Sequence, residues 1–185
     1  IRINNVDGML CSEFYDALVA HDLTFFAGVP DSLLKDICAY ITDHVPASQH
    51  VITANEGGAI ALAAGYHLST RKIGIVYMQN SGQGNAINPL VSLADPEVYS
   101  IPILLLVGWR GEPGVHDEPQ HIKQGKITLD LLNVLGIPYE VISNDPVASR
   151  KSLQNAVRSM QERQAPFALV IRKGSFESYT LQHKA

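Results

Sequence analysis

A glutamate, Glu56, stands where an apolar segment gives way to a run of very small residues. Residues 51–52 favour a β-strand, and residues 59–64 favour a helix. Gly57 and Gly58 carry no side chain, so another molecule can approach the backbone beside the carboxylate. Such a carboxylate can exchange a proton with a bound ring, although a helix N-terminus also stabilises a solvated carboxylate through its dipole. The two glycines favour the first interpretation, that of a functional group.

A second candidate for chemistry is the loop from Gln79 to Asn85, which carries two glycines and several amide side chains. Its glycines permit close approach to the backbone, and its amides could hold an anion or a polar ring. The loop is not the dinucleotide-binding fingerprint, because the third glycine of that motif is missing. It is not a nucleophile elbow around Ser81 either, because Gln79 and Gln83 stand where that motif needs glycine. The alternative interpretation is a tight turn between a strand and a helix.

A third candidate is the segment from His116 to His121, which combines two imidazoles with carboxylates. The spacing differs from the helical zinc motif, and Pro119 is expected to break any helix through the segment. We interpret the segment as a loop that carries acid–base groups, the alternative being an exposed polar loop. The nearby Arg110 and Lys123 could bind an anionic substrate group, since arginine makes bidentate contacts with such oxygens. Taken singly, each of these cations is more often a surface charge.

Two polar residues, Asp31 and Ser32, follow the first expected strand. One of them is expected to cap the N-terminus of the next helix, because Asp and Ser are preferred at that position. The other is then free to face a cleft at the end of the strand.

Strands and helices alternate along the chain, with short connections between them. The expected strands are 23–27, 50–54, 73–78, 101–108, 139–142 and 167–171, and the expected helices are 12–20, 32–41, 57–69, 86–93, 125–135 and 148–164. Strands that are apolar on both faces and alternate with helices indicate a parallel sheet covered on both sides. The predicted fold class is therefore an open three-layer α/β/α domain with a six-stranded, mainly parallel sheet.

In an open α/β sheet, ligands bind beyond the carboxyl ends of the strands. The segments that follow the first four expected strands are 28–32, 55–58, 79–85 and 109–121. They hold the candidate acids, amides and imidazoles, so the topology predicts that these groups gather at one edge of the sheet.

The composition is typical of one globular domain: 185 residues, of which 46% are hydrophobic and 17% charged. The net charge of −4 and the lack of a Lys/Arg cluster argue against nucleic-acid binding. No apolar run approaches the roughly 18 residues that span a bilayer. Cys11 and Cys38 are expected to be reduced core residues of a cytoplasmic protein. Residues 1–5 lack a secretory pattern and an initiator Met, so the sequence is expected to be a trimmed piece.

Together these residues resemble the pyrimidine-binding domain of thiamine-diphosphate-dependent decarboxylases. The stretches that carry the resemblance are 26–35, 54–57 and 77–85. The later segments 108–114 and 117–121 resemble the phosphonopyruvate decarboxylase branch of that family. The likeness covers about residues 10–175, and the α subunit of sulfopyruvate decarboxylase looks similar over the same span.

The resemblance implies conversion of 3-phosphonopyruvate to phosphonoacetaldehyde and CO2. It implies that Glu56 hydrogen-bonds the aminopyrimidine ring of thiamine diphosphate and drives the tautomer change that prepares this cofactor for attack on a 2-keto acid. It implies a cofactor and substrate cavity lined by Gly28, Val29, Pro30, Gln79, Asn80 and Gly82. It implies polar active-site groups among Asp31, Ser32, His116 and His121, whose separate roles stay open. From charge and loop position we add the hypothesis that Arg110 and Lys123 bind the phosphonate, with Ser32 as a further substrate contact.

The family binds the cofactor diphosphate through Mg²⁺ on a second domain with a Gly-Asp-Gly segment, which this chain lacks. The resemblance therefore implies that residues 1–175 are the pyrimidine-binding half of a site, followed at 176–185 by a tail or the start of a linker. A diphosphate-binding domain of another subunit would supply the other half, in a homo-oligomer or an αβ hetero-oligomer. No metal, membrane or nucleic acid is expected on this chain itself. Two rivals stay open: the same reaction on sulfopyruvate, and a noncatalytic α/β domain that binds a partner or a small metabolite.

Overall fold

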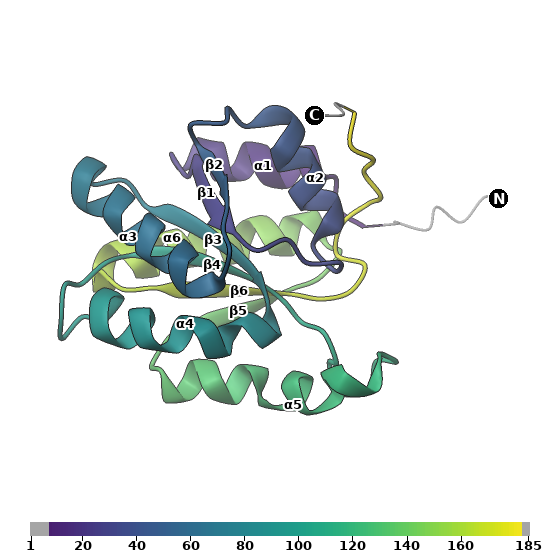
Figure 1. Cartoon of the computed structure of the whole chain (residues 1–185). Helices are drawn as coiled ribbons and strands as arrows, with labels where there is room; N and C mark the ends of the chain where they lie inside the picture. The colour runs from purple at the N-terminus through teal and green to yellow at the C-terminus, as the bar shows by residue number, and fades with distance from the viewer. Residues whose placement is uncertain (1–7, 183–185) are drawn as a thin grey trace.

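The computed structural model describes residues 8–182, and at its centre lies a six-stranded sheet in which every neighbouring pair is parallel (Figure 1). The strands are β1 (Phe25–Gly28), β2 (His50–Ile52), β3 (Gly74–Gln79), β4 (Ile103–Gly108), β5 (Tyr139–Ile142) and β6 (Phe167–Ile171). Their order across the sheet is β2-β1-β3-β4-β6-β5. The predicted six-stranded parallel sheet is confirmed.

Helices cover both faces of this sheet, which gives the three layers that the alternation predicted (Figure 1). One face is covered by α1 (Cys11–Ala20), α2 (Lys35–His44) and α6 (Pro146–Arg163). The other is covered by α3 (Glu56–Thr70), α4 (Gln83–Pro89), the π-helical turn η2 (Leu90–Ala94) and α5 (Pro119–Val134).

The sequence of strand β3 explains why the sheet is covered twice. Ile75 and Tyr77 belong to the core under α1, α2 and α6, whereas Val76 and Met78 belong to the core under α3, α4 and α5. All four side chains are almost completely buried. A strand with apolar residues on both faces is stable only when helices pack on each side of it.

The predicted strand bounds agree closely with the observed ones, but three helices begin elsewhere: α2, α5 and α4, the last at Gln83 in place of residue 86. No strand end shifts by more than two residues, and the predicted strands 139–142 and 167–171 are reproduced without change. Helix α2 begins at Lys35 and not at residue 32, and its N-cap is Leu34, with no side-chain capping bond. The prediction that Asp31 or Ser32 caps this helix is therefore wrong.

Helix α5 also begins earlier than the sequence predicted, at Pro119 in place of residue 125. Proline is favoured in the first turn of a helix, because the N–H that it lacks would have no partner there. The segment expected over residues 109–121 consequently leaves its loop at Glu118, and His121 lies on the first turn of the helix. Pro119 starts this helix; it does not interrupt one.

The end of the described chain packs back onto the first helices. Phe176 is buried, pairs through a backbone bridge with Met9, and stacks edge-on against Phe14. The backbone N–H of Tyr179 donates to Asp36 on α2 (3.0 Å). The expected domain limits, 1–175 and 176–185, extend into residues 1–7 and 183–185, which lie outside the described part, and the point where the domain ends stays a prediction.

The two cysteines are core residues, as expected. Cys11 and Cys38 are both buried and free, and burial raises the pKa of each thiol to about 12. Such thiols stay protonated and unreactive at neutral pH. Across residues 8–182, no helix combines the length and the apolar character needed to cross a membrane.

Candidate functional site

Glu56 is the first residue of α3, at the carboxyl-end edge of the sheet just beyond β2. Asn55 caps the helix, because its side-chain oxygen accepts a hydrogen bond from the N–H of Gly58 (2.8 Å). The Glu56 side chain is 8% exposed, and its Oε2 accepts a hydrogen bond from Nδ2 of Asn85 (2.8 Å). Its other oxygen, Oε1, has no hydrogen-bond donor within residues 8–182. One carboxylate oxygen is thus anchored, and the other is available to a ligand.

Gly82 brings the loop after β3 directly against this carboxylate. A Cβ atom at position 82 would lie 2.5 Å from the carboxyl carbon of Glu56 and 2.5 Å from its Oε1. The glycine therefore lets the loop approach Glu56, and the approach of a ligand to this backbone stays a prediction.

Gly28, another residue expected to line the cavity, has a packing reason for its identity. A Cβ atom there would collide with the backbone oxygen and the ring of Tyr77 on the neighbouring strand β3. Its neighbours Val29 and Pro30 are half-buried and exposed respectively at the edge of the sheet. Their contact with a cofactor stays a prediction.

Asn80 differs from its expected role. It is completely buried, and its Nδ2 donates to the backbone oxygen of Arg110 (2.8 Å) and to Oγ1 of Thr128 (2.8 Å). Its Oδ1 accepts from the N–H of Arg110 (3.3 Å). Both ends of the amide are therefore used by the protein, and we correct the assignment of its side chain from cofactor binding to anchoring of the loop. Gln79, in contrast, is half-buried, and its side-chain Nε2 donates to Oγ of Ser81 (2.7 Å).

Arg110 and Asp117 form the polar centre of the segment after β4. The guanidinium donates from Nε (2.8 Å) and Nη2 to the two oxygens of Asp117, and from Nη1 to Oγ of Ser32. This hydrogen-bonded guanidinium, with the backbone N–H groups of Gly111 and Glu118, holds the pKa of Asp117 well below its usual range. Because Asp117 already occupies the fork of Arg110, a bidentate contact of that fork with substrate requires Asp117 to be displaced.

The two histidines of this segment lie in different surroundings. His121 is partly buried, and its Nδ1 is 3.1 Å from Oδ1 of Asp117, which accepts a hydrogen bond from that nitrogen in the matching tautomer. That contact leaves Nε2 as the ring atom open to a ligand. His116 is exposed and makes no hydrogen bond or ion pair within the described residues, and Lys123 is exposed on α5. Their roles stay predictions.

Asp31 is a buried carboxylate next to strand β4. It is 6% exposed, neither of its oxygens has a hydrogen-bond partner of good geometry in the described chain, and a Cβ atom on Gly108 would lie 2.5 Å from its Oδ2. Burial raises its pKa, and the N–H groups of Leu33, Leu34 and Ser32 with the charge of Arg110 offset only part of that shift. A carboxyl group in this state can hold or release a proton closer to neutral pH than an ordinary aspartate can.

We expect Asp31→Asn to stabilise the fold at pH 8 by about 1 kcal/mol, because it removes a buried, unpaired charge. A folded-state pKa that is raised means that the wild type loses stability as the pH rises through that value, and that the loss is absent below the ordinary pKa of about 3.9. The gain should therefore be present at pH 8 and absent near pH 3. Urea denaturation at both pH values measures it; an equal effect at both, or a loss of stability at pH 8, contradicts it.

These groups lie at one edge of the sheet, as the topology predicted. Asp31, Glu56, Asn80 and Arg110 follow the carboxyl ends of β1, β2, β3 and β4, which are neighbours in the sheet. Hydrogen bonds join the segments in series, from Glu56 to Asn85, from Asn80 to Arg110 and from Arg110 to Ser32. The edge is therefore a connected polar structure.

Three residues of this structure were missed by the sequence reasoning. Asn85 anchors Glu56, and Thr128 and Gln124 on α5 hold the side chain and the backbone oxygen of Asn80. Asn85 ends the polar loop after β3, so its place in the sequence could have indicated a role at the site. The sequence around Thr128 and Gln124 gives no such indication, because only the packing of α5 against that loop brings them close.

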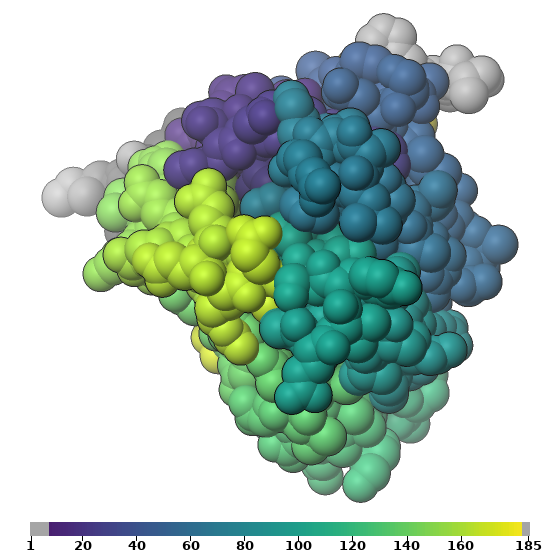
Figure 2. Space-filling model, turned by 90° about the vertical axis from the view of Figure 1, so that its left-hand side faces the viewer, coloured from purple at the N-terminus to yellow at the C-terminus, as the bar shows by residue number. Residues whose placement is uncertain are grey.

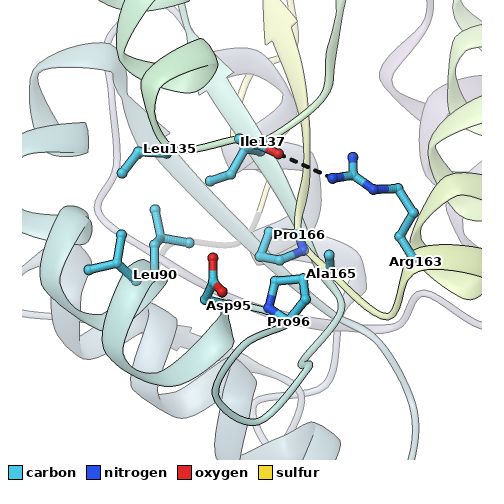
Figure 3. A pocket seen from close by; sticks show the side chains of 10 residues that line it. Leu90, Asp95, Pro96, Leu135, Ile137, Arg163, Ala165 and Pro166 are labelled. Carbon is cyan, nitrogen blue, oxygen red and sulfur yellow. Dashed lines mark hydrogen bonds between the residues drawn. The ribbon is translucent and has the colours of Figure 1, made fainter.

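A small cavity lies at the opposite edge of the sheet, just before the strands β4, β5 and β6 begin. Segments around residues 95–100 (teal) and 160–166 (yellow-green) lie side by side there, as Figure 2 shows. The cavity is only about 20 Å³, too small for a cofactor, and Arg163 closes one side by donating to the backbone oxygen of Gly136 (3.3 Å; Figure 3). Within residues 8–182 no group of three or more His, Cys, Asp or Glu side chains is arranged to hold a metal ion.

Comparison with known families identifies the class of domain. The model of the family "Thiamine pyrophosphate enzyme, N-terminal TPP binding domain" matches residues 12–133. The chain belongs to this family, whose cofactor, thiamine pyrophosphate, is the thiamine diphosphate named above.

The chain is similar to two kinds of decarboxylase within that class. It is 33% identical over 175 residues to "Phosphonopyruvate decarboxylase" of Streptomyces hygroscopicus, covering 94% of this chain and 42% of the relative. It is 32% identical over 157 residues to "Sulfopyruvate decarboxylase subunit alpha" of Methanococcus maripaludis, covering 85% of this chain and 90% of that subunit. The chain thus spans about two fifths of the phosphonopyruvate decarboxylase, but nearly the whole sulfopyruvate decarboxylase subunit.

A solved structure supports the fold. Benzoylformate decarboxylase from Polynucleobacter necessarius matches with a TM-score of 0.66 at 19% identity, over 96% of this chain and 33% of that one. The six-stranded parallel architecture is therefore also found in one part of that solved structure.

Proposed function

We propose that this chain forms the pyrimidine-binding half of a thiamine-diphosphate-dependent decarboxylase that converts 3-phosphonopyruvate to phosphonoacetaldehyde and CO2. The observation that carries the proposal is the state of Glu56. This acid is buried at the carboxyl-end edge of the sheet, with one oxygen held by Asn85 and the other open. Such an arrangement suits exchange of one proton with a bound ring.

The residues around Glu56 fit the pyrimidine ring of the cofactor. Gly57 and Gly58 follow the acid on α3, and Gly82 lies against it, so no bulky side chain covers the carboxylate from these positions. When bound, thiamine diphosphate supplies the carbon nucleophile and the electron sink of the decarboxylation. The sequence lacks the Gly-Asp-Gly segment that the resemblance associates with Mg²⁺ and the diphosphate group, so we assign both to a second domain.

The proposal gives the residues at this edge of the sheet roles in cofactor binding and in proton transfer. Glu56 would hold the pyrimidine ring through Oε1 and exchange a proton with it, and Asn85 fixes the carboxylate by donating to its other oxygen. Gly28, Val29, Pro30 and Gln79 would line the ring. His121, oriented by Asp117, is a candidate acid–base group for the substrate, with Asp31 and His116 as the other candidates. The efficiency of such a proton transfer depends on positioning, which the hydrogen bonds of Asn85 and Asp117 supply.

The working enzyme is proposed to be an oligomer that acts in the cytoplasm, where buried free thiols are usual. A diphosphate-binding domain of another subunit would complete each site, either in a homo-oligomer or in an αβ pair. The name "subunit alpha" carried by the relatives of similar length supports the second arrangement. The homo-oligomer is supported by relatives of which this chain covers only 37–42%, because such longer chains have room for a second domain.

The substrate is the point to test first. Two relatives named for phosphonopyruvate match 94% and 82% of this chain, and three named for sulfopyruvate match 71–85% of it. A side-by-side assay of 3-phosphonopyruvate and 3-sulfopyruvate, with the diphosphate-binding half present, decides between them. We expect a higher kcat/KM for 3-phosphonopyruvate. A higher kcat/KM for 3-sulfopyruvate would make the chain a sulfopyruvate decarboxylase α subunit. If neither substrate is turned over, both proposals are contradicted.

A further inference from the structure

A second cavity of about 300 Å³ opens beside the polar edge, between the start of α2 and the segment that follows β6. Its charged and hydroxyl-bearing lining consists of Ser32, Lys35, Asp36, Arg110, Asp117 and Lys173. Three of these side chains are cationic and two are anionic. The cavity therefore carries an excess of positive charge in a chain whose net charge is −4.

The carboxylates of this cavity are already engaged, whereas its lysines are not. Asp117 accepts from Arg110 and from the N–H of Gly111, and Asp36 accepts from the N–H of Tyr179. Lys35 and Lys173 make no hydrogen bond or ion pair with any residue of the described range. Two ammonium groups thus line one cavity without a partner of opposite charge.

The floor of the cavity connects to the proposed reaction site. Ser32 accepts a hydrogen bond from Arg110, which leaves its own hydroxyl hydrogen to donate to a ligand. The backbone of Arg110 is bound on both sides by Asn80, which begins the loop that carries Gly82 to Glu56. A small molecule could therefore place one end in this cavity and extend its other end along the same edge of the sheet.

We propose that Lys35 and Lys173 are specificity-determining residues that bind the anionic group on carbon 3 of the substrate, a phosphonate or a sulfonate. This inference rests on the proposed function and deepens it. It also revises the sequence hypothesis: Lys123 does not line the cavity, and Arg110 contributes there as a charge whose fork is held by Asp117. A compact ammonium group suits an anion with three oxygens, since it needs no planar match.

The test compares the complete enzyme, diphosphate-binding domain included, with its Lys35→Gln, Lys173→Gln and doubly substituted variants. The ratio of kcat/KM for 3-phosphonopyruvate to that for pyruvate, which lacks the second anion, should fall about tenfold for each lysine, as the loss of one charged contact predicts. Lys151→Gln, on exposed α6, is the matched control and should keep the wild-type ratio. An unchanged ratio in the double variant overturns the inference.

A binding measurement separates this inference from the proposed function. Calorimetry with phosphonoacetate, which has both anions but no keto group, should show binding to the wild type and at least about tenfold weaker binding to the double variant. Equal binding to both, or none to the wild type, overturns the inference. If the wild type binds phosphonoacetate through these lysines and yet turns over no 2-keto acid, the proposed function alone fails.

Discussion

Glu56→Gln should lower the turnover of the complete enzyme by about 10²–10⁴-fold, the usual cost of losing a positioned acid–base group. Glutamine keeps the size of the side chain, and its oxygen can still accept the hydrogen bond from Asn85. The variant should therefore fold as the wild type does, and only the exchange of a proton at Oε1 is lost. Steady-state turnover of 3-phosphonopyruvate and thermal unfolding, measured on the same preparation, check the two halves of this expectation.

Glu97→Gln is the matched control, because Glu97 is an exposed glutamate in the connection that leads into the amino end of β4, away from the polar edge at its carboxyl end. It should leave both turnover and unfolding unchanged. A Glu56→Gln variant with wild-type turnover would favour the rival interpretation, a noncatalytic α/β domain. A variant that loses activity only because its unfolding temperature collapses would show that Glu56 serves the fold and not the reaction.

The sheet was predictable because local composition and global topology agree along this chain. β-formers at 139–142 and 167–171 each follow a helical segment, and a parallel sheet follows from that alternation. The starts of α2 and α5 were not predictable in the same way. Asp31 and Ser32 look like caps, but Asp31 is buried beside Gly108 and Ser32 is bonded to Arg110, so tertiary contacts override the local preference.

The candidate site was predictable as a set of segments, but not as a set of contacts. The rule for carboxyl ends of strands brings the loops together, yet it does not say which amide anchors which group. Asn80 and Asn85 are of one residue type in one loop. The side-chain amide of Asn80 is hydrogen-bonded to Arg110 and Thr128, whereas that of Asn85 donates to Glu56. The pairing of Arg110 with Asp117 likewise depends on how the loop folds back, which spacing alone does not determine.

The second large effect is expected at Gly82, where an added methyl group would act on Glu56 and spare the fold. In Gly82→Ala, the new Cβ would lie 2.5 Å from the carboxyl group, and the carboxyl group is the far end of a flexible side chain. The Glu56 side chain can rotate away at little cost in stability. It then loses its hydrogen bond from Asn85, and its free oxygen no longer points toward the ligand. We expect turnover to fall about 100-fold, as misplacement of a catalytic group by about 1 Å does, with a loss of stability below about 1.5 kcal/mol.

Gly84→Ala separates this steric effect from a general effect on the helix. Gly84 lies two residues further on, in α4, with nothing within 4 Å of the position where its Cβ would stand. This substitution should keep wild-type turnover and raise stability slightly, because alanine is favoured over glycine in a helix. If Gly82→Ala and Gly84→Ala lose turnover equally, the cause is reduced flexibility of the segment after β3 and not a clash with Glu56. Full activity in Gly82→Ala would mean that Glu56 can work from a displaced position, which is incompatible with proton exchange at a fixed ring nitrogen.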